Sequence, residues 1–148
     1  MPLTLLHLGV LAPINHFAPG KVSNVSFIVV NLWIDLNAIL YVLWDIGGIT
    51  HGTEHSLIGV TFSATTVAML GVRSIKWVLG AYLGGISHAL LDALVHAELP
   101  LIYPYEGNPL YMGWMQPLSL VLLPFMIWLI AQYVSYSRGW IETRREVA

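Results

Sequence analysis

Long apolar runs, separated by short polar or glycine-rich links, set the pattern of this chain. Four of these runs approach the roughly 20 residues that a helix needs to cross a bilayer. They are residues 24–46, 55–72, 77–97 and 116–137. A shorter run, 3–18, is interrupted by Pro13 and predicts a tilted span, a re-entrant piece or an interfacial helix. We therefore expect a single all-α domain, a polytopic membrane helix bundle with four long transmembrane helices and a short N-terminal helix.

Composition supports a membrane protein. Of 148 residues, 57% are hydrophobic and only 9% are charged, and the mean hydropathy is +0.72. A soluble chain of this size has a large surface to cover, and a typical domain is about 25% charged. The absence of cysteine excludes thiolate metal ligands and cysteine nucleophiles. The net charge of −2, without a basic cluster, excludes nucleic acid as a partner.

The basic residues predict an orientation. They fall before the first long run, between the second and third, and after the fourth, at Lys21, Arg73, Lys76, Arg138, Arg144 and Arg145. An antiparallel arrangement places all of them on one side, and the opposite links, 47–54 and 98–115, contain neither Lys nor Arg. Cytoplasmic loops carry the excess of Lys and Arg, so the C-terminus is expected in the cytoplasm.

Polar side chains recur where a membrane helix disfavours them. His88, Asp92 and His96 are each four residues apart, which places them on one face of the third long helix. Charged groups inside a bilayer are costly and mark ion or substrate sites. The same topology brings further candidates to the outer half: His7, His51, His55 and Asp35. His16 falls toward the inner side and is expected to bond to a neighbouring carbonyl instead.

Imidazoles and carboxylates together are the ligands of zinc and other first-row divalent ions. The stretch 51-HGTEH-55 also fits His-x-x-Glu-His, a zinc-protease pattern in which Glu54 would be the base. That pattern needs a regular helix, and the nearby glycines disfavour one. The alternative is a helix that begins at Thr53, with Thr53 as its cap and Glu54 in its first turn.

Three blocks carry a resemblance to a known family: "HLG" at 7–9, "HGTEHSL" at 51–57 and "GGISHALLD" at 84–92. With them the chain resembles the bacterial inner-membrane metal-dependent hydrolases, a family that includes LexA-regulated, phospholipase-like members. The resemblance implies a bacterial inner-membrane location. It also implies the metal ligands His7, His51, His55, His88 and Asp92. Asp35 matches an acidic position that members show as Asp-x-Asp, and Asn37 departs from that pattern.

The leading hypothesis is a membrane-embedded hydrolase that acts on a lipid or lipid-linked ester, with membrane lipids as its surroundings. A divalent ion, zinc in the first place, would lower the pKa of a bound water, and Glu54 or Asp35 would act as general base. The tyrosine-rich link 98–117 is expected to form a lid or an interfacial cover. Alternatives are a transporter of divalent metal or protons, a haem-binding anchor with axial histidines, and a purely structural protein.

Overall fold

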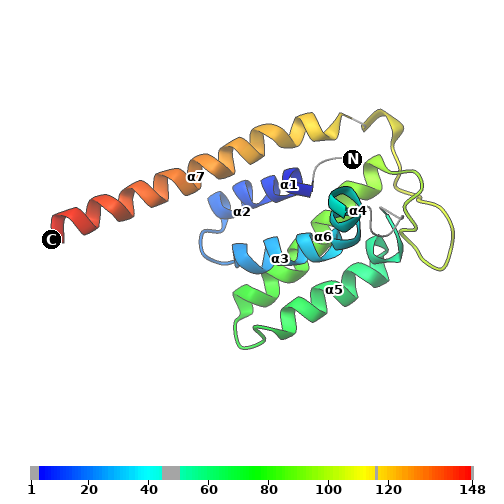
Figure 1. The fold of residues 1–148 in the computed structure, drawn as a ribbon, viewed down its shortest axis with the longest axis horizontal. Coiled ribbons are helices and arrows are strands. Elements are labelled where there is room, and N and C mark those ends of the chain that lie inside the picture. Colours follow the sequence, from blue (N-terminus) through cyan, green and yellow to red (C-terminus); the bar gives the residue numbers. More distant parts are fainter. Residues whose placement is uncertain (1–3, 45–50, 116, 148) are drawn as a thin grey trace.

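A computed structural model describes residues 4–44, 51–115 and 117–147 (Figure 1). Within these ranges the chain forms helices and turns and contains no strand, which confirms the all-α prediction for the described residues. The helices are α1 (Thr4–His7), α2 (Leu11–Phe17), α3 (Asn24–Ile34), α4 (Leu36–Trp44), α5 (Leu57–Met69), α6 (Ile75–Val95) and α7 (Leu118–Val147). Short 3₁₀ helices are η1 (Leu8–Val10), η2 (Thr53–His55) and η3 (Gly113–Met115).

Helix α6 is the centre of the bundle and packs against α3 on one side and α5 on another. Glycines make this close approach possible, because small residues let two helix backbones come close together. A Cβ atom on Gly84 would lie 2.6 Å from Cγ1 of Val30 and 2.9 Å from the carbonyl oxygen of Phe27. A Cβ on Gly85 would lie 3.1 Å from Val60 of α5. The two adjacent glycines therefore seat α6 against two helices at the same level.

The N-terminal segment lies between α3 and α7 (Figure 1). Its closest approach is at Gly9, where a Cβ atom would lie 3.0 Å from the backbone nitrogen of Met126 and 3.2 Å from the carbonyl oxygen of Leu122. Around this contact a buried apolar cluster joins the three elements: Leu8, Leu11, Ala12, Phe27 and Leu129. The glycine of the "HLG" block thus has a packing role, since it brings the segment that carries His7 against α7.

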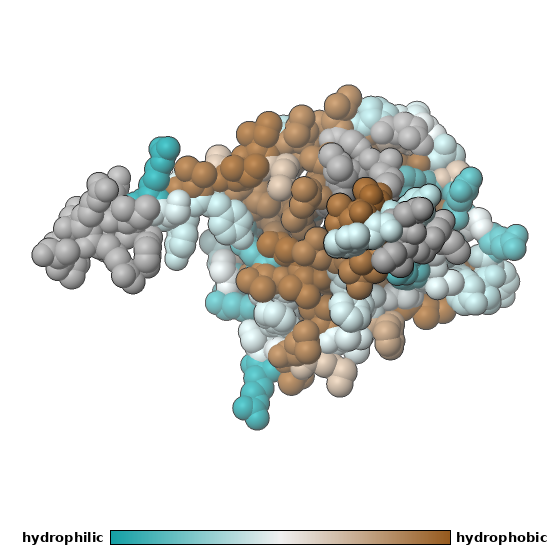
Figure 2. Space-filling model, viewed as in Figure 1, coloured by the Kyte–Doolittle hydropathy of each residue, from teal (hydrophilic) through white to brown (hydrophobic). Residues whose placement is uncertain are grey.

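The distribution of apolar and polar residues on α6 is the reverse of that on an amphipathic helix of a soluble protein. Its outward stripe consists of exposed large apolar residues, Leu79, Leu83, Ile86 and Leu90. Its inward stripe consists of small and polar residues, Gly80, Ala81, Gly84, Gly85, His88, Ala89, Asp92 and Ala93. Water favours the opposite distribution, whereas lipid tails favour apolar residues outside. Figure 2 shows that apolar side chains also gather on the visible face of the molecule, along α7 and over the middle of the bundle.

The prediction of four long spans is wrong. Among the residues that the structure describes, only α6 and the stretch Leu120–Arg138 of α7 are long and apolar enough to cross a membrane alone. Helices α3 and α4, which are bent by 60° relative to each other, together form a third candidate if the pair counts as one broken span. Helix α5 has 13 residues. At about 1.5 Å per residue it is roughly 20 Å long, too short for a hydrocarbon core of about 30 Å.

Local interruptions explain the difference. Helix α5 begins late because Ser56 caps it: the Ser56 hydroxyl accepts a hydrogen bond from the backbone N–H of Gly59 at 3.1 Å. Thr53, the cap proposed from the sequence, lies in η2 instead. The chain between α3 and α4 turns at Asp35, whose φ and ψ of −84° and 6° lie outside the helical region. The segment 3–18 forms α1, η1 and α2 rather than one regular helix.

The basic residues of the described chain gather at one end of the bundle, as the topology predicts. Lys21 lies in the turn before α3 and Arg73 in the turn between α5 and α6. The backbone N–H of Ser23 donates to the carbonyl oxygen of Lys76 at 2.9 Å, which ties these two turns together. The C-terminal part of α7 extends at the same end (Figure 1). The side chains of Arg144 and Arg145 lie outside the described part.

Candidate metal centre

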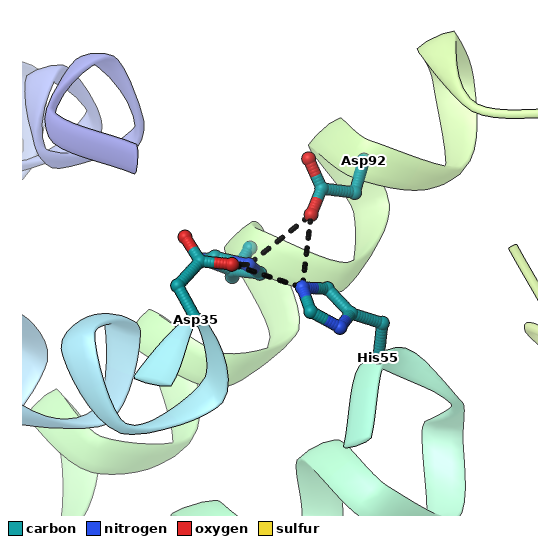
Figure 3. A group of neighbouring side chains, drawn as sticks. Asp35, His55 and Asp92 are labelled. Carbon is teal, nitrogen blue, oxygen red and sulfur yellow. Dashed lines mark hydrogen bonds and ion pairs between the residues drawn. The ribbon is translucent and has the colours of Figure 1, made fainter. Parts of the chain in front are cut away.

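Four buried side chains from three separate segments converge at the opposite end of the bundle. Asp35 occupies the break after α3, His55 ends η2, and His88 and Asp92 lie one turn apart on α6. Figure 3 shows Asp35, His55 and Asp92 pointing toward one another. One donor atom from each of the four lies within 4.8 Å of every other. We call these residues the tetrad.

The tetrad has the dimensions of a metal coordination shell. A tetrahedral zinc site with bonds of about 2.0–2.1 Å has edges of about 3.3 Å. Oδ1 of Asp35 lies 2.9 Å from Nε2 of His55 and 3.3 Å from Nε2 of His88. Oδ2 of Asp92 lies 3.1 Å from Nε2 of His88 and 3.6 Å from Nε2 of His55. Four of the six edges are thus those of a tetrahedron around a first-row ion.

Hydrogen bonding determines which nitrogen of His88 is free for an ion. The amide of Asn31 donates from Nδ2 to the carbonyl oxygens of Phe27 and Gly84, at 2.8 and 3.4 Å. Its Oδ1 therefore faces Nδ1 of His88, 2.9 Å away, and accepts the proton of that nitrogen. The Nε2 atom of His88 then faces two carboxylates, an arrangement that needs a proton or a metal cation between the ring and the carboxylates. Asn31 positions the imidazole, as outer partners of metal-bound histidines commonly do.

Charge supports the same interpretation. The two carboxylates of the tetrad are almost fully buried, with side chains 8% and 3% exposed. In the described part of the chain, the ion-pair partners of Asp92 are all histidines: His7, His55, His88 and His96. Buried carboxylates are stable only when paired or bound to a metal. A divalent cation would neutralise both carboxylates at once, and the donor set therefore fits such an ion.

His7 lies against the tetrad without belonging to it. Its side chain is buried, its Nε2 lies 3.4 Å from Oδ1 of Asp92, and its Nδ1 lies 3.3 Å from Nδ1 of His88. The His7 Nε2 atom has no hydrogen-bond partner among the described residues. His7 therefore lies beside the tetrad, and its role as a ligand stays a prediction. It faces Oδ1 of Asp92, whereas the tetrad histidines face Oδ2.

Glu54 sits behind His55 rather than inside the tetrad. Its Oε1 lies 3.8 Å from Nδ1 of His55, whereas Nε2 of the same ring faces the tetrad. Glu54 also accepts hydrogen bonds from the backbone of Gly52 and from Asn37, at 3.3 and 3.4 Å. Because η2 covers Thr53–His55 and α5 begins only at Leu57, His51 and His55 do not share a regular α-helix. The zinc-protease interpretation of this stretch is therefore wrong.

His51 and His96 form a second, partly exposed group with Asp92. One donor atom from each of the three lies within 4.8 Å of the others, and the two rings stack with centroids 4.0 Å apart. Burial lowers the pKa of His51 to about 4, with a further contribution from His96, and burial also lowers the pKa of His96. Both rings are therefore neutral at pH 7 and keep a lone pair. The structure places His51 beside His96 and Asp92 and not in the tetrad with His55, and its role as a ligand stays a prediction.

The link after α6 holds this second group in place. The Asn108 side-chain amide donates to the carbonyl oxygens of Ala93 and His96, at 2.6 and 2.7 Å, and closes the end of α6. The backbone N–H of Leu57 donates to Leu101 at 2.9 Å, which fixes the link against the start of α5. The link is thus docked on the two helices that carry the site.

Sequence reasoning missed one residue and undervalued another. Asn31 precedes Asp35 by four residues on the same helix face, a spacing that could have indicated its role. His96 belonged to the stripe of His88 and Asp92 but was not among the predicted ligands. His16 lies outside the tetrad: it is exposed, and its ring packs near Phe17 and Trp128. The expected bond from His16 to a neighbouring carbonyl stays a prediction.

No protein-family model, no curated protein and no solved structure matches the chain. The resemblance to inner-membrane hydrolases stays a prediction that depends on its three sequence blocks.

Proposed function

We propose that this protein is a membrane-embedded, metal-dependent hydrolase that acts on a lipid or lipid-linked ester. One observation carries the proposal: the tetrad places two carboxylates and two imidazoles from three segments at the spacing of a metal coordination shell. The three sequence blocks contribute the hydrolase class, and the lipid-like outer surface of α6 contributes the substrate class.

The tetrad residues would hold the ion, and their surroundings would prepare them for it. A divalent ion bound there would supply Lewis acidity and stabilise the charge that develops on the oxygens of the ester. In a neutral His88, Asn31 holds the proton on Nδ1 and leaves the lone pair of Nε2 directed inward. Glu54, 23% exposed and next to His55, is the group best placed to exchange a proton with solvent, and Asp35 is better placed as a ligand.

A bacterial inner-membrane location with the basic ends in the cytoplasm follows from the same proposal. The chain has no cysteine, so a single introduced cysteine reports topology without background. In intact spheroplasts, we expect a membrane-impermeant maleimide to label Tyr105→Cys and to spare Arg73→Cys, which it should label after lysis. Both native side chains are exposed. The reverse pattern would contradict the proposed orientation.

Two alternatives make different demands on the site. A transporter needs a continuous line of polar groups beyond the tetrad, but the core between α3, α5 and α6 contains a cluster of apolar residues, with Val30, Ile34, Val60 and Ala64. A haem needs room between two axial rings, but the rings of His55 and His88 have centroids 5.4 Å apart. Neither observation favours these functions over hydrolysis.

The experiment measures metal first and turnover second. The full chain, purified in mild detergent without chelator, should contain a divalent metal by elemental analysis. His55→Ala/His88→Ala should lose that metal and any release of head group or fatty acid from phospholipid vesicles. His16→Ala is the matched control, because His16 is an exposed histidine outside the tetrad. Unchanged metal content and turnover in the double variant would refute the proposal.

A further inference from the structure

The Asp92 carboxylate faces two different sets of histidines, one with each oxygen. Its Oδ2 faces Nε2 of His88 at 3.1 Å and Nε2 of His55 at 3.6 Å, within the tetrad. Its Oδ1 faces Nε2 of His7 at 3.4 Å and Nε2 of His96 at 3.9 Å. A carboxylate with ligand-type nitrogens on both oxygens has the disposition of a bridge between two cations.

The two histidines that face Oδ1 of Asp92 have ring nitrogens without a hydrogen-bond partner among the described residues. The Nε2 atoms of His7 and His96 are buried and have no hydrogen-bond partner among the described residues. His7 is 1% exposed, and its Nε2 points at Oδ1 of Asp92. Buried polar atoms without a partner are rare and costly, and an ion is one of their ordinary explanations. This observation is independent of the close grouping of His51, Asp92 and His96.

The tetrad and the second group, which consists of His51, His96 and Asp92, differ in the number of donor atoms and in exposure to solvent. The tetrad offers four protein donors, the number found in closed zinc sites. The second group offers two imidazoles and one carboxylate, the type of set that leaves a position open for water or substrate in catalytic zinc sites. The His96 side chain is 20% exposed and His51 is partly exposed, whereas the tetrad side chains are at most 8% exposed.

We propose that His51, His96 and Oδ1 of Asp92 hold a second divalent transition-metal ion, which shares the Asp92 carboxylate with the ion of the tetrad. The inference rests on the proposed function, because Asp92 belongs to both sites. The tetrad ion is the closed, anchoring one, and the second ion provides the open position toward solvent. Paired cations of this kind stabilise both the attacking and the leaving oxygen of a hydrolysed ester.

The test counts cobalt(II) ions bound to the full chain in detergent after removal of native metal. We expect the wild type to bind about two ions per chain, as paired-metal sites do, and His51→Ala/His96→Ala to bind about one. His16→Ala should bind as the wild type does. If the wild type binds one ion and the double variant still binds it, the second site is refuted while the proposed function stands. If the wild type binds none, the proposed function fails as well.

A second measurement on the wild type covers the case in which the variant does not fold. Manganese(II) loaded to saturation should give the electron paramagnetic resonance spectrum of a spin-coupled pair, because one carboxylate joins the two ions. A spectrum of isolated manganese alone would overturn the proposal. Chelator should also remove the two ions in separate phases, the partly exposed one first, and a single phase would count against the proposed difference between the sites.

Discussion

In the described part of the chain, α6 and α7 are the two helices long and apolar enough to cross a membrane alone, yet they pack differently. Half of the apolar stretch of α6 is buried inside the protein, compared with 11% of that of α7. Helix α6 turns its glycines and ligand residues inward, whereas α7 contacts mainly the N-terminal segment and exposes large apolar residues, Leu120, Val121, Leu123, Ile127 and Ile130 among them. Hydropathy alone therefore does not distinguish a helix that carries the site residues, such as α6, from a helix that packs at the edge of the bundle, such as α7.

The largest effect should come from filling the contact between α6 and α3. In Gly84→Leu the new side chain meets the carbonyl oxygen of Phe27, and the backbones must separate. We expect a loss of about 3 kcal/mol in the free energy of unfolding, the upper range for overpacking, measured by thermal unfolding in detergent. Leu83→Ala, on the outward face of the same helix, is the control. An unchanged melting temperature in Gly84→Leu would mean that the two helices do not touch there.

A smaller effect should follow when α6 keeps its place but His88 loses its orienting partner. Asn31→Leu removes the acceptor of the Nδ1 proton with little change in volume. Loss of such outer partners costs about 10–100-fold in metal affinity, and we expect a reduction of this size for cobalt(II) measured by competition with a chelator. Asn15→Leu, in the N-terminal segment away from the tetrad, should leave the affinity unchanged. Equal cobalt(II) affinities in the two variants would show that Asn31 does not orient His88 for metal binding.

The smallest effect should be on the outward face of α7. Leu120 is 72% exposed, so Leu120→Ala removes no packing, and we expect the free energy of unfolding to change by less than about 0.5 kcal/mol. Leu122, two residues away, is 6% exposed, and its carbonyl oxygen faces Gly9. Leu122→Ala should cost about 2 kcal/mol in the same unfolding measurement, the lower end of the range for buried leucines. Similar values for the two variants would contradict the position of α7 in the bundle.

Agreement between sequence and structure is best where one helix fixes the geometry. His88 and Asp92 are four residues apart on α6, and this spacing alone places them on a common face. Agreement is weakest where loops carry the ligands. Because η2 interrupts the stretch before α5, His55 enters the tetrad while His51 faces His96 instead. Two histidines of one short sequence stretch thus belong to two different groups of side chains. No local sequence pattern indicates that they separate.

The sequence by itself determined the helical class, the apolar exterior, the common end of the basic turns and the residue types of the site, because these follow from composition and helical spacing. Only the tertiary structure decided that the chain bends by 60° at Asp35, that α5 is short, and that the two oxygens of Asp92 face different histidines. The physical reason is range: helical spacing is set by hydrogen bonds between near neighbours. The direction of a side chain at a helix break or in a loop is set by packing between segments far apart in the chain.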